Sequence, residues 1–354
     1  MSDNIRMDSH KLIFHPDVVS KWLGGEEIYP LSVEVGLSNV CNHRCIFCAV
    51  DYSEYKGKFI DKEIILSALK TLSEKGAKSV VFSGEGEPLL HKDAALIINK
   101  TKSYGLDAAL STNGVLFDEA VARECLQSLT WIRFSVSAST PETYAKIHQT
   151  KEADFHTALK NIKNAVSVKK EEKLGVTIGV QLLLLPENIK EAVSLAEILR
   201  DIGVDYFTIK PYSEHPDSIN DNRPDYVSMN AEIRKIEVQL REAQTNDYKV
   251  FFRAGQMEKL EYNRPYKKCC GMDFMCHIDS QGDVIPCIMY FGNPEYRFGN
   301  LYDSNIDSIW ESRHKVCDKI NATELKGCRE VCRLNEMNIY LNELMHPGAH
   351  VNFV

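Results

Sequence analysis

The sequence lacks long hydrophobic runs and dense basic segments. Apolar stretches such as Leu182 to Leu185 are far shorter than the roughly 20 residues of a membrane-spanning helix. Lysines and arginines occur at most in pairs, and the formal net charge is -8; the chain therefore shows no footprint for a phosphate backbone. Neither a membrane nor a nucleic acid is predicted as a partner. The N-terminus shows no export signal, and we expect a cytoplasmic protein.

Cysteine, in contrast, is plentiful, with eleven residues in the chain. In a secreted protein these would suggest disulfides, but a reducing compartment keeps thiols available for metals or catalysis. Three cysteines lie within residues 41–48 and seven between 269 and 332, which leaves Cys125 alone. This clustering is the main indication of function.

Strand-like and helix-like segments alternate along the first two thirds of the chain. Glycines such as Gly76, Gly105 and Gly203 mark the joins. The predicted strands are 31–37, 79–83, 107–111, 131–136, 176–185 and 206–209, and the predicted helices between them are 61–75, 91–104, 118–129, 155–170 and 189–202. Such alternation predicts a parallel sheet, and six units favour an α/β fold with a partial (β/α)6 TIM-like barrel. Functional loops should gather at the carboxyl ends of the strands.

The regular pattern stops after Lys210. Residues 211–225 are rich in Pro, Asp, Asn and Ser, a helix is expected over 228–246, and the cysteine-rich tail begins at Cys269. We therefore predict an N-terminal extension (1–30), a barrel (31–225) and a small cysteine-rich C-terminal domain (226–354).

The first cysteine group, Cys41, Cys45 and Cys48, comes after the first predicted strand with the spacing C-x3-C-x2-C. One short loop can direct three thiolates at a single iron–sulfur cube, and no fourth cysteine occurs within the next seventy residues. Three ligands leave one iron open, which is where a metal site binds a substrate. The alternative is a zinc knuckle completed by His43, which is disfavoured because His43 lies inside the C-x3-C segment.

This segment, CNHRCIFC, resembles the signature of the radical S-adenosylmethionine (SAM) superfamily, C-x3-C-x-aromatic-C, with Phe47 as the aromatic residue. The resemblance implies a [4Fe–4S] cluster that binds SAM at its open iron and cleaves it reductively to a 5′-deoxyadenosyl radical. It also implies an external electron donor of the flavodoxin or ferredoxin type. The cofactor performs the difficult chemistry, and the protein orients the reactants.

The SGEGEP segment at 83–88 ends the second predicted strand and is similar to the family's Gly-Gly-Glu-Pro stretch, which contacts the SAM amino group. Gly86, Glu87 and Pro88 match this stretch, whereas Glu85 departs from it. Glycines allow close approach to a ligand, and a carboxylate such as Glu87 suits an ammonium group. An ordinary turn is the alternative interpretation.

Polar side chains also end the third and fourth predicted strands. Ser111 and Asn113 lie in STNG, and Ser137 lies in SVSAS. Their hydroxyl and amide groups could bond the SAM ribose or carboxylate, and capping or turn roles are the alternative.

The tail contains a second cysteine group, for which we select Cys270, Cys287, Cys328 and Cys332. The segment HIDSQGDVIPC predicts a hairpin that ends at Cys287. The tail resembles the SPASM or shorter twitch domains of radical SAM enzymes, which have a cysteine followed by Gly-x4-Cys, here Gly282 to Cys287. The resemblance implies one auxiliary [4Fe–4S] cluster. Cys269 could replace Cys270, Cys276 or Cys317 could be a ligand, and zinc is the rival metal.

The reaction class depends on the fate of the substrate radical after hydrogen abstraction. Transfer of an electron to the auxiliary cluster predicts dehydrogenation, whereas return of hydrogen from a thiol predicts epimerisation, with Cys276 and Cys317 as candidate donors. Lys210, at the end of the sixth strand, could orient an anionic substrate or act as a base, or could be a surface lysine.

The resemblance to members with a single auxiliary cluster makes a carbohydrate-like or aminocyclitol-like substrate the first choice. A peptide maturase is the second, although only about thirty residues precede the first strand, too few for a winged-helix peptide-recognition module. An iron–sulfur electron carrier or zinc-stabilised binding protein is the alternative from another class.

Overall fold

A single open sheet of ten strands organises the computed structural model, which describes residues 9–53, 55, 57–220, 222–253, 257, 264–329 and 331–353. The strand order is β10-β9-β8-β1-β2-β3-β4-β5-β6-β7, and all pairs from β8 to β7 are parallel. The strands are β1 (Ser32–Val35), β2 (Ser79–Phe82), β3 (Asp107–Thr112), β4 (Leu129–Ser135), β5 (Thr177–Leu184), β6 (Tyr206–Pro211), β7 (Lys249–Phe252), β8 (Met275–Ile278), β9 (Asp283–Ile285) and β10 (Gly299–Asn300).

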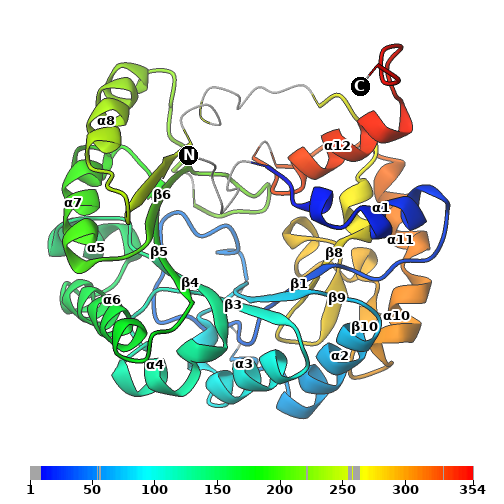
Figure 1. The fold of residues 1–354 in the computed structure, drawn as a ribbon, viewed down its shortest axis with the longest axis horizontal. Helices are drawn as coiled ribbons and strands as arrows, with labels where there is room; N and C mark the ends of the chain where they lie inside the picture. Colours follow the sequence, from blue (N-terminus) through cyan, green and yellow to red (C-terminus); the bar gives the residue numbers. More distant parts are fainter. Residues whose placement is uncertain are drawn as a thin grey trace.

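The sheet curls into an incomplete ring, and the helices between its strands cover the outside (Figure 1). The prediction of a partial TIM-like barrel is confirmed. The helices of the barrel are α2 (Lys62–Glu74), α3 (Ala94–Ser103), α4 (Glu119–Cys125), α5 (Pro141–His148), α6 (Ala153–Glu171), α7 (Ala192–Ile202) and α8 (Asn230–Glu242). The sheet is longer than six units, because β7 joins β6 and β8 joins β1 at its two edges. The parallel sheet therefore continues past the domain boundary predicted at residue 225, which stays a prediction.

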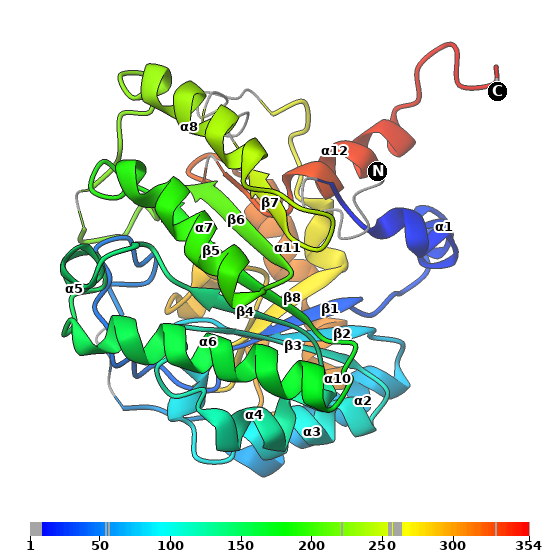
Figure 2. The same ribbon diagram turned by 60° about the vertical axis from the view of Figure 1, so that its left-hand side comes forward.

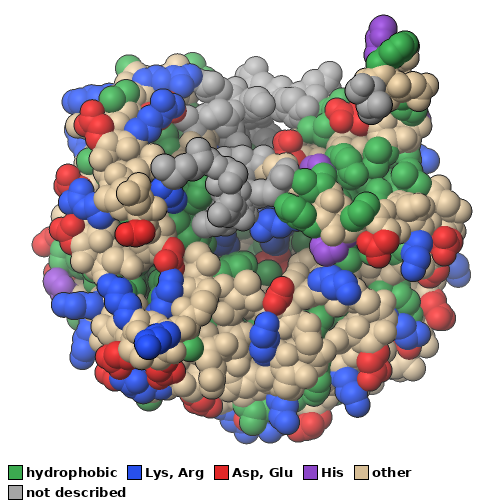
Figure 3. All heavy atoms as spheres, viewed as in Figure 1, with side chains coloured by type: hydrophobic (Ala, Val, Ile, Leu, Met, Phe, Trp, Pro, Cys, Tyr) green, Lys and Arg blue, Asp and Glu red, His purple; other side chains and the backbone are tan. Residues whose placement is uncertain are grey.

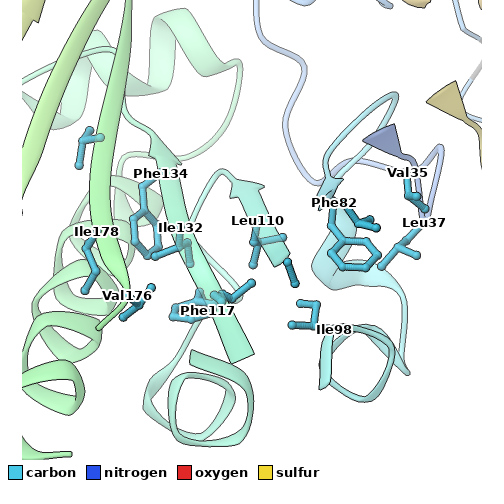
Figure 4. Close-up of a cluster of buried hydrophobic side chains, with 14 of the residues drawn as sticks. Val35, Leu37, Phe82, Ile98, Leu110, Phe117, Ile132, Phe134, Val176 and Ile178 are labelled. Atoms are coloured by element: carbon cyan, nitrogen blue, oxygen red, sulfur yellow. The ribbon is translucent and has the colours of Figure 1, made fainter. Parts of the chain in front are cut away.

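Hydrophobic side chains between the strands and the outer helices form the core (Figure 4). In β4, Ile132 and Phe134 are fully buried, and the residues that alternate with them face the interior of the ring. The Asp61 carboxylate caps α2 by accepting hydrogen bonds from the backbone N–H groups of Glu63 and Ile64 at 2.8 and 3.2 Å. Sequence periodicity predicts these elements well because each buries one apolar face.

Helix α5 was not predicted from the sequence. It is only eight residues long and begins with Pro141 after the N-cap Thr140, whose hydroxyl accepts a hydrogen bond from the backbone N–H of Thr143 at 3.3 Å. So short a helix gives little periodic signal. It nevertheless matters for the site, because its last residue is His148.

The C-terminal segment builds outward from β8. The predicted hairpin is present as β8 and β9, and the turn between them contains Gly282 with φ of 83°. Helices α10 (Ile306–Ser312), α11 (His314–Asn321) and α12 (Asn335–Met345) complete the segment. Figures 1 and 2 show α12 beside the N-terminal helix α1 (Pro16–Leu23), and Leu341 of α12 packs in one apolar cluster with Val19 of α1.

Among the described residues, no helix has both the length and the apolar character needed to cross a bilayer.

Candidate active site

The first three cysteines lie on the loop that leaves the carboxyl end of β1. Backbone hydrogen bonds from Arg44 to His148 and from Ile46 to Ile147, at 3.0 and 2.9 Å, attach this cysteine loop (residues 36–60) to the end of α5. A further backbone bond, from Cys48 to Cys45 at 3.0 Å, closes the turn between the second and third thiols. The loop is therefore held in a defined shape at the barrel mouth.

Gly86 supports the cysteine loop from the end of β2. A Cβ atom at this position would lie 2.4 Å from the carbonyl oxygens of both Ser38 and Val40. The backbone N–H of Glu87 also donates to the carbonyl of Val40 at 2.8 Å. Only glycine permits this close approach of the two backbones. Close packing against the cysteine loop therefore explains why this position is glycine. The predicted contact of Gly86 with SAM stays a prediction.

Burial keeps the three thiols from ionising on their own. It raises the pKa of Cys41 to about 11, and the pKa of Cys45 and Cys48 is raised as well, mainly by burial. The charges of Cys41 and Cys48 also raise the pKa of Cys45, which shows that the three sulfurs lie together. Thiolates here need a compensating positive group, and an iron–sulfur cluster supplies it.

The spacing of these thiols fits a cluster better than a single ion. In a tetrahedral zinc site, bonds of about 2.3 Å place neighbouring sulfurs roughly 3.8 Å apart. Cys41, Cys45 and Cys48 do not bring their three Sγ atoms within 4.8 Å of one another. A four-iron cube accommodates wider spacing because each thiolate binds a different iron.

His148 donates a hydrogen bond to Cys45. The backbone N–H of Ser137 donates to Nε2 of His148 at 3.1 Å, so the ring proton must sit on Nδ1, which lies 3.2 Å from Sγ of Cys45. Burial lowers the pKa of His148 well below its usual range and keeps the ring neutral. Atoms of His43, Cys45 and His148 lie within 4.8 Å of one another, but Nδ1 of His148 carries a proton and is no metal ligand. The zinc alternative with His43 gains no support from this arrangement.

Glu87 is 2% exposed, and its carboxylate accepts hydrogen bonds from other residues of the protein. It accepts hydrogen bonds from the Thr112 hydroxyl at 2.7 Å and from the backbone N–H groups of Asn113 at 2.8 Å and Leu89 at 3.1 Å. Burial raises the pKa of Glu87, although these hydrogen bonds oppose the shift. The carboxylate joins the ends of β2 and β3, and its predicted role toward the SAM ammonium stays a prediction.

The polar residues at the ends of β3 and β4 lie around the cysteine loop. The side-chain amide of Asn113 donates to Oδ1 of Asn42, in the loop, at 2.6 Å. Ser111 is half-buried on the interior face of β3, while Ser137 is buried beside His148. The Phe47 ring packs edge-on against the His148 ring, with centroids 5.4 Å apart. The structure therefore brings Asn113, Ser137 and Phe47 to the cysteine loop and the end of α5, while Ser111 pairs in register with Arg133 on β4.

The second thiol group consists of Cys269, Cys287, Cys328 and Cys332. The pKa of Cys269 is raised well above its usual value, first by burial and then by the charges of the other three. Its Sγ accepts a hydrogen bond of 3.4 Å from the Asn338 side chain of α12. No three of these sulfurs lie within 4.8 Å of one another, which again matches a cluster rather than one ion.

Cys270, which the sequence analysis selected as a ligand, lies against a separate apolar cluster and not among the other three cysteines. It packs against the apolar cluster that contains Leu12, Val19 and Phe274. Burial and the charge of Asp273 raise its pKa to about 11, with no contribution from another cysteine. Adjacent residues direct their side chains apart, and spacing alone gives no means of ranking Cys269 against Cys270.

One apolar cluster contacts both Cys48 and the residue that follows Cys287. Val50, Ile285 and Phe291 form its buried part, and Cys48 and Ile288 pack against it. Cys48 belongs to the first group, and Ile288 comes directly after Cys287 of the second. The cysteine loop and the segment around Cys287 therefore meet at this cluster, although they are far apart in the sequence.

The remaining predicted residues separate into interior and exterior positions. Lys210 of β6 is half-buried, and its electrostatic neighbours include Arg133 and Glu34 on distant strands of the ring. Cys276 pairs in register with the core residue Val33, is fully buried, and lies on the face of β8 opposite to His277. Cys317 on α11 neighbours Asp273 and Arg313. The structure brings neither candidate hydrogen donor to the barrel interior.

Sequence reasoning missed a charged network around β1 and β8, in which Glu85 and His277 are buried. Glu34 forms an ion pair with Arg333 and accepts a hydrogen bond from the Ser83 hydroxyl. His277 lies between Glu34 and Glu85, with nitrogen–oxygen distances of 3.9 and 3.8 Å. In the sequence, Glu85 stood out because it departs from the family's Gly-Gly-Glu-Pro stretch. The Glu85 carboxylate occupies the space beside Gly36 that a side chain would fill. A Cβ atom on Gly36 would lie 2.1 Å from Oε2 of Glu85.

The partial parallel barrel and its two groups of cysteine thiols indicate a barrel protein that binds iron–sulfur clusters. Residues 35–199 match the radical SAM superfamily, and residues 269–333 match SPASM, an iron–sulfur cluster-binding domain. The chain belongs to the radical SAM superfamily and carries a C-terminal SPASM domain. The resemblance found in the sequence is confirmed, as are the predicted cofactors, SAM, a [4Fe–4S] cluster and an auxiliary iron–sulfur cluster.

Curated relatives cover the first half of the fold. A probable GTP 3′,8-cyclase from Methanocaldococcus jannaschii is 31% identical over 174 residues, which are 49% of this chain and 56% of the relative. A probable GTP 3′,8-cyclase from Saccharolobus islandicus is 30% identical over 173 residues, 49% of this chain and 54% of the relative. The chain therefore spans little more than half the length of these relatives.

Solved structures share the fold over more of the chain. Streptococcus suis SuiB bound to S-adenosylmethionine has a TM-score of 0.68 and 16% identity, and covers 98% of this chain and 80% of its own. Hexahistidine-tagged anSMEcpe with bound AdoMet has a TM-score of 0.60 and 17% identity, and the match covers 87% of this chain and 88% of its own. At these identities the likeness establishes the fold alone.

Proposed function

We propose that this radical SAM enzyme removes a hydrogen atom from a small polar substrate in the barrel and completes a two-electron oxidation. Cys41, Cys45 and Cys48 hold the SAM-binding cluster in this proposal. The observation that carries it is the cysteine loop: three thiols on one loop after β1 at the mouth of a parallel barrel, with His148 as a hydrogen-bond donor to Cys45 rather than a fourth ligand.

The auxiliary cluster is assigned to Cys269, Cys287, Cys328 and Cys332. Cys269 takes the place of Cys270, the ligand expected from the sequence, because its sulfur lies among the other three and Cys270 lies in a separate apolar cluster. Asn338 orients Cys269, and its Oδ1 also accepts a hydrogen bond of 2.8 Å from the backbone N–H of Gly271. Four thiolates close this site, so it transfers electrons and does not bind SAM.

Cys41, Cys45 and Cys48 would hold a cluster that could supply the electron for reductive cleavage of SAM to a 5′-deoxyadenosyl radical. Cys269, Cys287, Cys328 and Cys332 would hold a cluster that could accept one electron from the substrate. The substrate loses a hydrogen atom from carbon, then one electron, and a proton from its hydroxyl. These losses sum to two electrons and two protons and convert an alcohol into a ketone. A protein group at the barrel interior receives the proton, and Lys210 is our candidate because burial and neighbouring cations lower its pKa well below the usual range.

Oxidation is favoured over epimerisation by the positions of the remaining thiols. Once seven cysteines are assigned to clusters, Cys125, Cys270, Cys276 and Cys317 are left. Cys125 and Cys276 are buried in the main core, Cys317 packs within it, and Cys270 joins a second apolar cluster. None of these thiols faces the barrel interior, where a hydrogen donor for the substrate radical would have to lie.

A carbohydrate-like or aminocyclitol-like molecule remains our first choice of substrate. A peptide is the second candidate, since SuiB has been solved bound to the precursor peptide SuiA and shares the fold over 98% of this chain. Nucleotide cyclisation, named for the curated relatives, is not proposed because those matches cover 49% of this chain.

Anaerobically purified protein tests the proposal through its metal content and its products. We expect about eight irons and eight sulfides per chain for two cubes, and formation of 5′-deoxyadenosine on reduction with SAM. Deuterium from labelled sugars should enter 5′-deoxyadenosine, whereas transfer only from labelled peptides would support the second candidate. Colourless protein that contains zinc and does not cleave SAM would contradict the proposed function.

A further inference from the structure

A segment that contains no helix or strand, residues 212–220, follows β6 at the barrel mouth; we call it the mouth strap. Its first residue is fixed to the barrel. The backbone N–H of Tyr212 donates to the Tyr226 hydroxyl at 2.6 Å, and this hydroxyl donates to the carbonyl of Leu184 in β5 at 2.7 Å. Phe47 of the cysteine loop packs against the apolar cluster that contains Tyr212. The strap therefore begins at a defined place beside the cysteine loop.

The far end of the strap is held by Asp51 of the cysteine loop. The Asp51 carboxylate accepts hydrogen bonds from the Ser218 hydroxyl at 3.0 Å and from the backbone N–H groups of Ile219 at 3.2 Å and Asn220 at 2.7 Å. The side-chain amide of Asn220 also donates to the carbonyl of Cys45 at 3.5 Å. Hydrogen bonds to a charged acceptor are stronger than those between neutral groups. This end of the strap is thus firmly attached to the cysteine loop.

His215 lies at the centre of the strap and is 1% exposed. Its ring stacks on the ring of Tyr52 in the cysteine loop, with centroids 4.8 Å apart. The Tyr52 hydroxyl lies 3.4 Å from Nε2 of His215 and 3.4 Å from the carbonyl oxygen of Phe291, four residues after Cys287. The middle of the strap is therefore covered by the cysteine loop and lies close to the second thiol group.

Arg329 binds the strap from the side of the second thiol group. It follows Cys328 directly, and its Nε donates to the Ser213 hydroxyl at 3.0 Å. Its Nη2 donates to the carbonyl oxygen of Ser213. Both hydrogen bonds come from one planar guanidinium group, which fixes direction as well as distance. Arg329 therefore connects the second thiol group to the same strap that Asp51 holds.

A second arginine ties Cys332 to the barrel wall. Arg333 follows Cys332 and forms the ion pair with Glu34 of β1. Glu34 faces the barrel interior, because its two neighbours in β1 are buried in the main core. Figure 3, in the same view as Figure 1, shows a hollow within the ring of strands, which is the space that the proposed function gives to the substrate. The second thiol group is thus attached at two points, to the strap through Arg329 and to β1 through Arg333.

We propose that Arg329 is a positioning residue that, through the mouth strap, holds the auxiliary cluster at a fixed distance from the SAM-binding cluster. Asp51 is the positioning residue at the other end of the strap. Cys328, Arg329 and Cys332 lie outside helices and strands, so their places depend on such side-chain contacts. The inference rests on the proposed function, in which the auxiliary cluster must stay close enough to the substrate to accept its electron.

Hydrogen exchange of the anaerobic holoenzyme tests the connection along the strap. Arg329→Gln removes the guanidinium at one end and should raise the exchange rates of the Ile219 and Asn220 amides at the other end by roughly tenfold, the equivalent of one charge-assisted hydrogen bond. Arg329→Lys keeps a donor and should recover part of the protection. Lys326→Gln, at an exposed position near the second thiol group, is the matched control and should exchange like the parent protein.

Electron paramagnetic resonance of the reduced holoenzyme gives a second measurement that requires no substrate. The magnetic interaction between the two reduced clusters reports their separation. It should be weaker or more widely distributed in Arg329→Gln and in Asp51→Ala than in the parent protein and in Lys326→Gln. Asp51→Ala releases the strap at the end away from the second thiol group, so its effect does not arise from damage beside Cys328. The iron content of every preparation reports whether both clusters are present.

An unchanged magnetic interaction in both Arg329→Gln and Asp51→Ala would overturn the inference. Exchange effects of Arg329→Gln that are confined to residues 213–215 would also overturn it, because the strap would then not connect the two thiol groups. Formation of 5′-deoxyadenosine by the parent protein, measured separately with SAM after reduction, tests the proposed function. Its absence would leave the exchange rates and the cluster separation as they are, so the two failures are distinguishable.

Discussion

The two thiol groups of this protein are built in opposite ways. The cysteine loop places Cys41, Cys45 and Cys48 within eight residues at the end of one strand. The second group joins Cys269, Cys287, Cys328 and Cys332 through a hairpin, a helical region and a side chain of α12. A local site can be read from spacing, whereas a site assembled from distant segments depends on the fold. In the proposed assignment the two groups also differ in closure, since the first would be an open site with three ligands and the second a closed site with four.

The largest effect is expected from removal of the local site. Replacement of Cys41, Cys45 and Cys48 together by Ala should abolish formation of 5′-deoxyadenosine, because no other described thiol lies where it could replace them. The iron content should fall by about half, to the roughly four irons of one cube. Liquid chromatography of reduced reactions and iron analysis measure the two effects. Continued SAM cleavage by this variant would show that the cysteine loop is not the SAM site.

Adjacent cysteines offer a sharp test of the assembled site. Cys269→Ser should lose the auxiliary cluster, with about half of the iron, and should lose product formation more than SAM cleavage. Cys270→Ser is the matched control and should retain both clusters, since Cys270 packs with Val19 and Phe274. The reverse result, in which only Cys270→Ser loses iron, would restore the ligand set selected from the sequence.

Glu85 and His277 join the two regions, because Glu85 lies just after β2 and His277 belongs to β8. Burial opposes protonation of His277, but the negative charges of Glu34 and Glu85, 3.9 and 3.8 Å away, outweigh it and raise the pKa to about 9. Asp279 is also close, and Arg333 pairs with Glu34 on the other side. A raised pKa stabilises the fold fully below about pH 6.5, the unfolded value, and this contribution disappears as pH rises through about 9.

Chemical unfolding between pH 6 and pH 10 should therefore show a loss of up to about 3 kcal/mol from this histidine. His277→Gln should flatten that part of the profile, and His156→Gln, at an exposed position on α6, should leave it unchanged. An unaltered slope in His277→Gln would mean that the pH dependence arises elsewhere.

The smallest predicted effect concerns the hydrogen bond from His148 to Cys45. A donor to a cluster sulfur stabilises the more negative, reduced state and so raises the reduction potential. His148→Phe should lower the potential of the SAM-binding cluster by roughly 40 mV, the equivalent of about 1 kcal/mol for one electron. His148→Asn keeps a donor and should recover much of the shift. Redox titration followed by electron paramagnetic resonance measures these values, and identical potentials in all three proteins would exclude this role.

Sequence patterns were sufficient for the barrel and the cysteine loop because both depend on local information. Apolar alternation marks strands such as β2 and β5, and the thiol spacing marks the loop. Strands β7 and β8 were missed as barrel strands because they follow the end of the regular strand–helix alternation, and the β8 segment was assigned to a hairpin although it also pairs with β1. Helix α5 was too short to give a periodic signal, and with it His148 was missed. The choice between Cys269 and Cys270 depends on side-chain direction, which spacing does not encode.

The most direct test of the two-cluster assignment is the response of each cluster to SAM, followed by electron paramagnetic resonance of the reduced protein. SAM should change the signal that depends on Cys41, Cys45 and Cys48, because that cluster has an open iron. It should leave unchanged the signal that remains in the triple Ala variant, because four thiolates close the auxiliary cluster. A change caused by SAM in that variant, or no change in the parent protein, would contradict the division into an open and a closed site.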